Sequence, residues 1–212
     1  MHIPDGFLNA ATLAGSGVIT AGGVATAISV AGAKIGEKQI PMMGIMAAFI
    51  FAAQMLNFPV AGGTSGHLIG AALCALLLGP WSAVIVMTLV LAAQALIFQD
   101  GGLLALGANI LNMGIIGGLG SYMVFKLLSG ISRGNRLLNF SAIFMAAWLS
   151  VVLAAAACAL ELALSGISPL RVVLPVMMAV HALIGVGEGL VTLAVFGLIK
   201  VSRPDLLVLH KV

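Results

Sequence analysis

Charged residues are scarce in this sequence. Asp, Glu, Lys and Arg together make up 7% of the 212 residues, against roughly 25% in an ordinary soluble domain. Hydrophobic residues make up 62%, and the mean hydropathy is +1.23. This composition excludes a soluble globular domain and predicts an integral protein of the cell membrane, in contact with lipid. The net charge of +3 does not indicate a nucleic-acid partner, because the basic residues lie between apolar segments, where membrane topology explains them.

Three further signals are sparse or missing. The two cysteines, Cys74 and Cys158, each lie inside an apolar run, which leaves no disulfide framework and no CxxC zinc site. No GxxxxGK(S/T) phosphate loop occurs, so we expect no ATP site of that kind, no organic cofactor and no enzymatic activity. Residues 1–10 contain no Lys or Arg, which argues against a cleavable signal peptide, and we expect the N-terminus to be retained.

Long apolar runs fill most of the chain. A membrane-spanning helix needs about 20 predominantly apolar residues, whereas a barrel strand would show about 10 residues of alternating polarity. The runs therefore predict an all-α membrane protein of about seven transmembrane helices, in one integral membrane domain over residues 1–212. The expected segments fall near residues 10–33, 41–57, 67–79, 81–98, 103–128, 139–165 and 173–200.

The distribution of basic residues predicts how these segments are oriented in the membrane. With the N-terminus outside and the C-terminus cytoplasmic, only Arg171 among the nine basic residues lies outside, as the positive-inside rule favours. The outer face then carries residues 1–9, the loop 58–67 and residues 99–102. The eight basic residues expected on the cytoplasmic side are Lys34, Lys38, Lys126, Arg133, Arg136, Lys200, Arg203 and Lys211.

The loop 58–67 reads FPVAGGTSGH and contains one proline and three glycines. These residues do not hold a regular helix. An irregular backbone at membrane depth is stable only where protein or a water-filled cavity satisfies its polar groups. We therefore predict that the loop folds inward and forms part of a binding site.

The chain begins with a histidine directly after Met1, and this pair forms a chelator. The Met1 amine and the deprotonated amide nitrogen of His2 close a five-membered ring on a metal, and the amide with the His2 imidazole Nδ1 closes a six-membered ring. Nearly planar nitrogen coordination favours Cu(II) or Ni(II), with Co(II) close in preference. Either His2 or His67 alone is more commonly a solvated or core histidine. Together on the outer face they favour a metal site in which His67 supplies the fourth nitrogen.

Other polar residues suggest supporting roles. Candidate supports for the two loops are Asp5, Asn57, Thr64, Ser65 and Gln94. Glu161, His181 and Glu188 lie inside apolar segments, and His181 and Glu188 are seven residues apart, on one face of the last helix. Ionisable groups within a membrane suggest function by default. Two interpretations stay open for these three: a structural hydrogen-bond network, or the proton pathway of a self-sufficient, proton-coupled divalent-metal permease.

Several long motifs resemble one family. They are MHIPDGFL at residues 1–8, NFPVAGGTSGHLIG at 57–70, QALIFQDGGL at 94–103, GANILNM at 107–113 and HALIGVGE at 181–188. In this order they resemble the NikM/CbiM family, the substrate-binding (S) components of energy-coupling factor (ECF) transporters for nickel and cobalt. The resemblance implies a six-helix S-component core with an added N-terminal helix. It also implies a square-planar four-nitrogen site from Met1, His2 and His67, all present here.

The resemblance implies a function and partners as well. It implies high-affinity capture of Ni(II) or Co(II) and its transport across a prokaryotic inner or plasma membrane. The partners would be a transmembrane coupling (T) component, cytoplasmic ATP-binding cassette ATPases and a small accessory membrane protein. The ligands do not separate nickel from cobalt, since both accept nitrogen donors.

Overall fold

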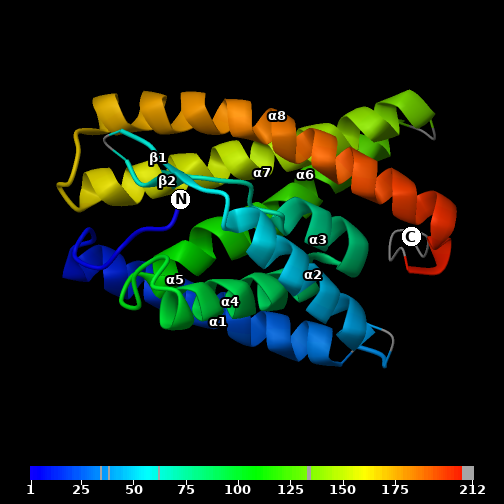
Figure 1. The fold of residues 1–212 in the computed structure, drawn as a ribbon, viewed down its shortest axis with the longest axis horizontal. Helices are drawn as coiled ribbons and strands as arrows, with labels where there is room; N and C mark the ends of the chain where they lie inside the picture. The colour runs from blue at the N-terminus through cyan, green and yellow to red at the C-terminus, as the bar shows by residue number, and fades with distance from the viewer. Residues whose placement is uncertain (34, 38, 62, 133–134, 207–212) are drawn as a thin grey trace.

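A computed structural model describes residues 1–212 except 34, 38, 62, 133–134 and 207–212. Its described part consists of helices apart from one short hairpin and the connecting loops (Figure 1). The helices are α1 (Ala10–Gly32), α2 (Gln39–Gln54), α3 (Ala71–Leu78), α4 (Pro80–Ile97), α5 (Leu106–Asn109), the π-helical stretch η1 (Ile110–Gly120), α6 (Ser121–Ser132), α7 (Arg136–Leu164), α8 (Leu170–Ser202) and the 3-10 turn η2 (Pro204–Leu206). The hairpin pairs β1 (Phe58–Pro59) with β2 (Ser65–Gly66).

The helix ends follow from local residues. Asn9 caps α1, because its side chain accepts a hydrogen bond of 2.8 Å from the Thr12 amide. Asn135 caps α7 in the same way by accepting from the amides of Leu137 and Leu138. Pro80 occupies the first position of α4, where its missing N–H costs no helical hydrogen bond.

The predicted seven-segment pattern is confirmed. Five helical stretches are long and apolar enough to cross a membrane: 10–32, 80–97, 106–132, 136–164 and 170–202. α2 is a shorter apolar helix of 16 residues. The third segment differs from its predicted range of 67–79, because only the eight residues of α3 are helical. At 1.5 Å per residue α3 is about 12 Å long and cannot cross a bilayer by itself. All eight of its residues are buried.

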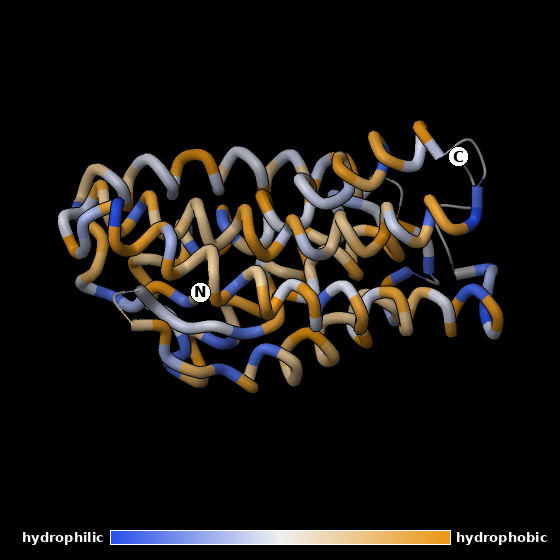
Figure 2. Tube along the Cα trace, turned by 90° about the horizontal axis from the view of Figure 1, so that it is seen from above, coloured by the Kyte–Doolittle hydropathy of each residue, from blue (hydrophilic) through white to orange (hydrophobic). Residues whose placement is uncertain are grey.

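The helices run roughly side by side along the long axis (Figure 1). α7 and α8 pack along each other, α1 lies against α4 and α5, and α3 sits in the interior. Figure 2 shows hydrophobic residues along the length of the bundle, with strongly hydrophilic stretches mainly towards its ends. The N-terminus reaches the interior beside the hairpin, and Met1 has no exposed surface.

The two ends of the bundle differ. We call the end that carries residues 1–9, 55–61, 63–70 and 98–105 the site end. We call the opposite end, where α6 ends at Ser132, α7 begins at Arg136 and α8 ends at Ser202, the basic end. Among the described residues, four basic ones lie at the basic end, and all are exposed: Lys126, Arg136, Lys200 and Arg203. Lys34, Lys38, Arg133 and Lys211, which entered the orientation argument, lie outside the described residues. Arg171 lies at the site end, as the predicted topology requires.

Candidate metal centre

Hydrogen bonds to the backbone of Ile3 fix the first residues of the chain inside the site end. The Ile3 amide donates to Asn109 Oδ1 (2.8 Å), and Asn109 Nδ2 donates back to the Ile3 carbonyl (3.1 Å). The same carbonyl accepts from the Gly102 amide at 2.9 Å. Ile3 and Asn109 are both buried. One side-chain amide thus satisfies both backbone groups of Ile3, and this sets the depth of the two residues ahead of it.

Asp5 holds the outer part of the same segment. Its carboxylate accepts hydrogen bonds from three consecutive amides, those of Leu103 (3.0 Å), Leu104 (2.8 Å) and Ala105 (3.2 Å). Hydrogen bonds to a charged acceptor are stronger than neutral ones. Asp5 therefore ties the N-terminal segment to the loop that leads into α5.

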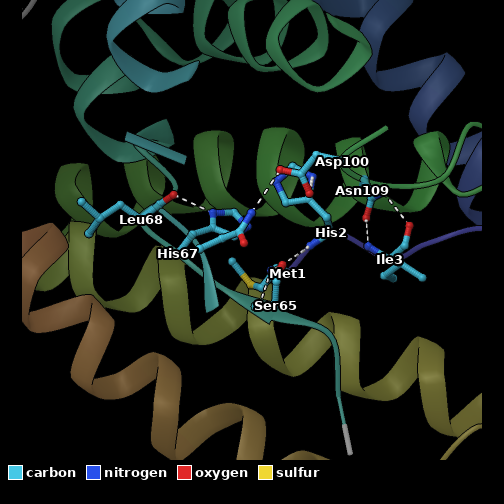
Figure 3. Close-up of polar contacts among 9 residues, drawn as sticks. Met1, His2, Ile3, Ser65, His67, Leu68, Asp100 and Asn109 are labelled. Atoms are coloured by element: carbon cyan, nitrogen blue, oxygen red, sulfur yellow. Dashed lines mark hydrogen bonds and ion pairs between the residues drawn. The ribbon is translucent and has the colours of Figure 1, made fainter. Parts of the chain in front are cut away.

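The β1–β2 hairpin places Ser65 next to the chain terminus. Phe58 pairs with Gly66 and Pro59 with Ser65. The Met1 amine donates to the Ser65 carbonyl and also to Ser65 Oγ at 2.8 Å. The His2 amide donates to the same Oγ at 3.2 Å. Because both donors converge on one oxygen, the amine and the His2 amide nitrogen face the same side, as Figure 3 shows.

Two imidazoles lie against each other beside the amine (Figure 3). The ring centroids of His2 and His67 are 4.6 Å apart, and both side chains are buried. His67 Nδ1 lies 2.7 Å from the Leu68 carbonyl. A carbonyl only accepts, so Nδ1 carries the proton and Nε2 keeps its lone pair. Among the described residues, this Nε2 has no hydrogen-bond partner. His67 thus presents a free nitrogen donor within the site.

The electrostatic environment keeps these nitrogens neutral. Burial lowers the pKa of the Met1 amine from 8.0 to about 5, and burial together with the nearby amine lowers the pKa of His2 to about 3. Asp100 lies at the rim, with Oδ1 3.8 Å from His2 Nδ1, and burial raises the pKa of its carboxyl. A metal binds neutral amine and imidazole, so at neutral pH protons do not compete for these two groups.

The comparisons with known proteins identify the family. The sequence model described as the cobalt uptake substrate-specific transmembrane region, CbiM, matches residues 2–206. The chain belongs to the CbiM family. The predicted family resemblance is therefore confirmed. With its five long apolar helices, the chain is a multi-pass integral membrane protein of a nickel and cobalt transport family.

Relatives in this family carry transport names. A protein of Archaeoglobus fulgidus that bears the name of a fused nickel transport protein, NikMN, is 42% identical over 214 residues, which cover 98% of this chain and 68% of that protein. The cobalt transport protein CbiM of Geobacter sulfurreducens is 33% identical over 175 residues, which cover 79% of this chain and 49% of that protein. A crystal structure of a transition metal transporter matches with a TM-score of 0.87 at 36% identity, covering 95% of this chain and 93% of that one.

The remaining candidate supports lie at different distances from the terminus. Ser65 contacts it directly, and Asn57 Nδ2 donates to Asp100 Oδ2 at 3.3 Å. Thr64 Oγ1 lies 3.7 Å from the sulfur of Cys158. Gln94 is buried, and neither polar atom of its side chain has a partner in the described part of the chain. Asn109, whose side-chain amide holds the backbone of Ile3, was not among the predicted site residues, although it lies inside one of the family motifs.

Glu161, His181 and Glu188 bond to different partners in the described part of the chain. His181 Nδ1 bonds the Met177 carbonyl of its own helix at 2.7 Å. Glu161 accepts from Asn112 Nδ2 at 2.6 Å. Glu188 accepts from the amides of Ile69 and Gly70. His181 and Glu188 share one face of α8, but these hydrogen bonds do not join the three side chains to one another. The structural network and the proton pathway both stay predictions.

Proposed function

We propose that this chain captures Ni(II) or Co(II) as the substrate-binding component of an ECF importer. The ion would lie in a plane of four nitrogens: the Met1 amine, the His2 amide nitrogen, His2 Nδ1 and His67 Nε2. The observation that supports this most strongly is the buried chain terminus, where the His2 ring lies 4.6 Å from the ring of His67, whose Nε2 has no partner in the described part of the chain. A buried neutral amine next to two imidazoles has no evident structural use.

The geometry supports chelation by the backbone itself. The amine and the His2 amide face the same side, towards Ser65 Oγ, so the five-membered ring needs little rearrangement of the chain. Ile3 and Asp5 hold that stretch of backbone in place. Ordering these groups before the ion arrives reduces the entropy lost on binding.

A filled planar site suits transport better than catalysis. Four protein nitrogens leave no in-plane position for a reacting water, whereas a catalytic metal keeps a coordination position open. Met1, His2 and His67 are at most 5% exposed, so an ion at this position would be shielded from water. This environment fits a cargo that must be held and later released.

We further propose that release needs partner proteins. The sequence has no phosphate loop, so the energy for uphill transport would come from a coupling component and cytoplasmic ATPases, with a small accessory membrane protein. In this proposal residues 1–9 and the loop 58–67 face outward, and the basic end faces the cytoplasm, as the positive-inside rule predicts.

Calorimetric titration with Ni(II) and Co(II) tests the proposal. Purified protein with a free Met1 amine should bind one ion per chain, and competition between the two metals would identify the preferred cargo. His67→Ala should weaken nickel binding by at least about 100-fold, above the roughly 10–100-fold range for groups that only support a ligand. Unchanged affinity in this variant, with its helical circular dichroism intact, would contradict the site.

Reconstitution separates the proposal from a self-sufficient permease. In proteoliposomes the chain alone should give little sustained metal uptake along a pH gradient. Addition of the coupling component and ATPases with ATP should give uptake. Pronounced gradient-driven uptake by the chain alone would favour the permease instead.

A further inference from the structure

Two buried side chains hold the backbone just after His67. Glu188 on α8 accepts hydrogen bonds from the Ile69 amide through Oε2 (2.9 Å) and from the Gly70 amide through Oε1 (2.7 Å). Gln54 on α2 donates from Nε2 to the Ile69 carbonyl at 2.7 Å. Glu188 is 3% exposed and Gln54 is fully buried. The chain between the hairpin and α3 is thus fixed from two helices.

Tight packing fixes the position of Glu188. Gly185 and Gly189 flank it on α8, and a Cβ at these positions would lie 2.9 Å from Trp148 and 2.5 Å from Phe144 of α7. Trp148 Nε1 also donates to the Ala182 carbonyl at 2.9 Å. Only glycine allows this close approach of α8 to α7. The carboxyl group therefore has a defined place in the interior.

The hydrogen bonds from Glu188 lead to the His67 ring through one peptide group. The Leu68 carbonyl and the Ile69 amide belong to the same peptide unit. Glu188 accepts from the amide side of this unit, and its carbonyl side accepts from His67 Nδ1. A hydrogen bond on one side of a peptide polarises the other side. This arrangement corresponds to the carboxylate–histidine–metal chain of many metal sites, with a peptide group inserted between carboxylate and imidazole.

The conformation of Gly70 depends on the same carboxyl group. Gly70 has φ +77°, a left-handed conformation that costs little for glycine only, and a Cβ there would lie 2.7 Å from Ile50. With the Gly70 amide bonded to Glu188, α3 begins at Ala71. The turn between His67 and α3 is therefore defined by Glu188 on one side and by steric fit on the other.

We propose that Glu188 is a positioning residue for His67, which acts through the Leu68–Ile69 peptide to keep Nε2 aimed at the bound ion. This inference rests on the proposed metal site and gives a buried carboxyl group of α8 a role in it. It also links α8 to the proposed metal ligand His67, so a partner protein that displaces α8 would also shift the His67 ring.

A double-mutant cycle on nickel affinity tests this role. Glu188→Gln keeps the size of the side chain, but its amide group faces one backbone N–H without an acceptor. Nickel affinity should fall about 10–100-fold, the usual cost of a lost supporting group. If Glu188 acts through His67, the loss should disappear in the His67→Ala background. A general loss of stability would instead lower affinity in both backgrounds.

The electronic spectrum of bound nickel provides a second readout. At saturating nickel, Glu188→Gln should shift the visible absorption of the wild-type complex towards that of His67→Ala. The matched control is Glu161→Gln, which changes another buried carboxyl group that bonds Asn112 rather than the loop. This control should keep wild-type affinity within about twofold, since its hydrogen bonds do not reach His67.

The outcomes separate the two proposals. Wild-type nickel affinity and spectrum in Glu188→Gln, or equal losses with and without His67, would overturn the positioning role alone. Unchanged binding in His67→Ala would overturn the metal site and the positioning role together. If Glu188→Gln does not fold, Gln54→Leu is measured in the same double-mutant cycle. A loss of nickel affinity that occurs with His67 but not in His67→Ala supports the inference, and an unchanged nickel affinity contradicts it.

Discussion

At the site end of the bundle polar side chains bond to loop backbone, and Asn109 and Glu188 among them are buried, whereas the described basic residues at the basic end are exposed. Ser65, Asp5 and Glu188 each accept from two or three groups at the site end. At the other end, Lys126 and Lys200 lie on the surface. Arg203 pairs with Asp205 at 2.8 Å, but both side chains are more than half exposed.

Polar and charged residues thus have different roles at the two ends of this membrane protein. Exposed charges at the basic end set topology and contribute little to the fold, because surface ion pairs are worth only about 0–1 kcal/mol. A buried polar group at the site end that loses its partner costs about 1–3 kcal/mol. The site end therefore carries a network whose single members matter, and substitutions there should have far larger effects.

The largest effect is expected from one glycine added ahead of Met1. The amine would become a peptide nitrogen, and no exposed surface remains at Met1 to admit another residue. Nickel affinity should fall by at least about 100-fold, more than a supporting group usually costs. Calorimetry on the extended protein, before and after proteolytic removal of the glycine, measures this. Equal affinity in the two forms would show that a free amine on Met1 is not required for binding.

A change in pH is expected to have a smaller effect on nickel binding for each pH unit. The pKa of the docked Met1 amine is about 5, against 8.0 when free. A lowered pKa means that protons favour the undocked terminus, so docking is fully stable above pH 8 and is weakened as pH falls towards about 5. This costs about 1.4 kcal/mol per pH unit in that window. Separately, metal binding releases the His2 amide proton, which lowers metal affinity by about tenfold for each unit that the pH falls.

Nickel titrations between pH 8 and pH 6 measure this dependence. Affinity should fall by about tenfold per unit, from the released His2 amide proton, because the docked amine with its pKa of about 5 is already neutral in this range. An affinity independent of pH would contradict the deprotonated amide.

The smallest effect at the site end is expected from Asp5→Asn. The amide keeps one acceptor oxygen and loses the other, which weakens the contacts to Leu103, Leu104 and Ala105. A loss of about 1–2 kcal/mol corresponds to roughly tenfold weaker nickel binding. The matched control is Lys126→Gln at the basic end, which should leave affinity unchanged. Similar losses in both variants would remove the contrast between the two ends.

Much of the fold could be predicted because long apolar runs have few alternatives in a membrane. The exception is the third segment, where residues 67–70 continue the apolar run but are not helical. Their conformation depends on Glu188 and Gln54, which are more than a hundred and about fifteen residues away. Composition alone does not contain that information.

The meeting of Met1, His2 and His67 followed from chelate chemistry together with topology. The residues that support this site could not be predicted as readily from the sequence. Asn109 binds Ile3 across 106 positions of sequence, and the spacing of polar residues does not indicate such a pair. Glu188 was expected beside His181 because the two share a helical face. Spacing along one helix defines the face but not the partner across it, and here the partner was the backbone of another segment.

X-ray absorption of the nickel-loaded protein, with its magnetic susceptibility, tests the central claim most directly. The proposed site predicts a diamagnetic, square-planar ion with four nitrogen neighbours, and one fewer protein nitrogen in His67→Ala. A paramagnetic, six-coordinate ion with mainly oxygen neighbours, unchanged by His67→Ala, would contradict coordination by the chain terminus and the two histidines.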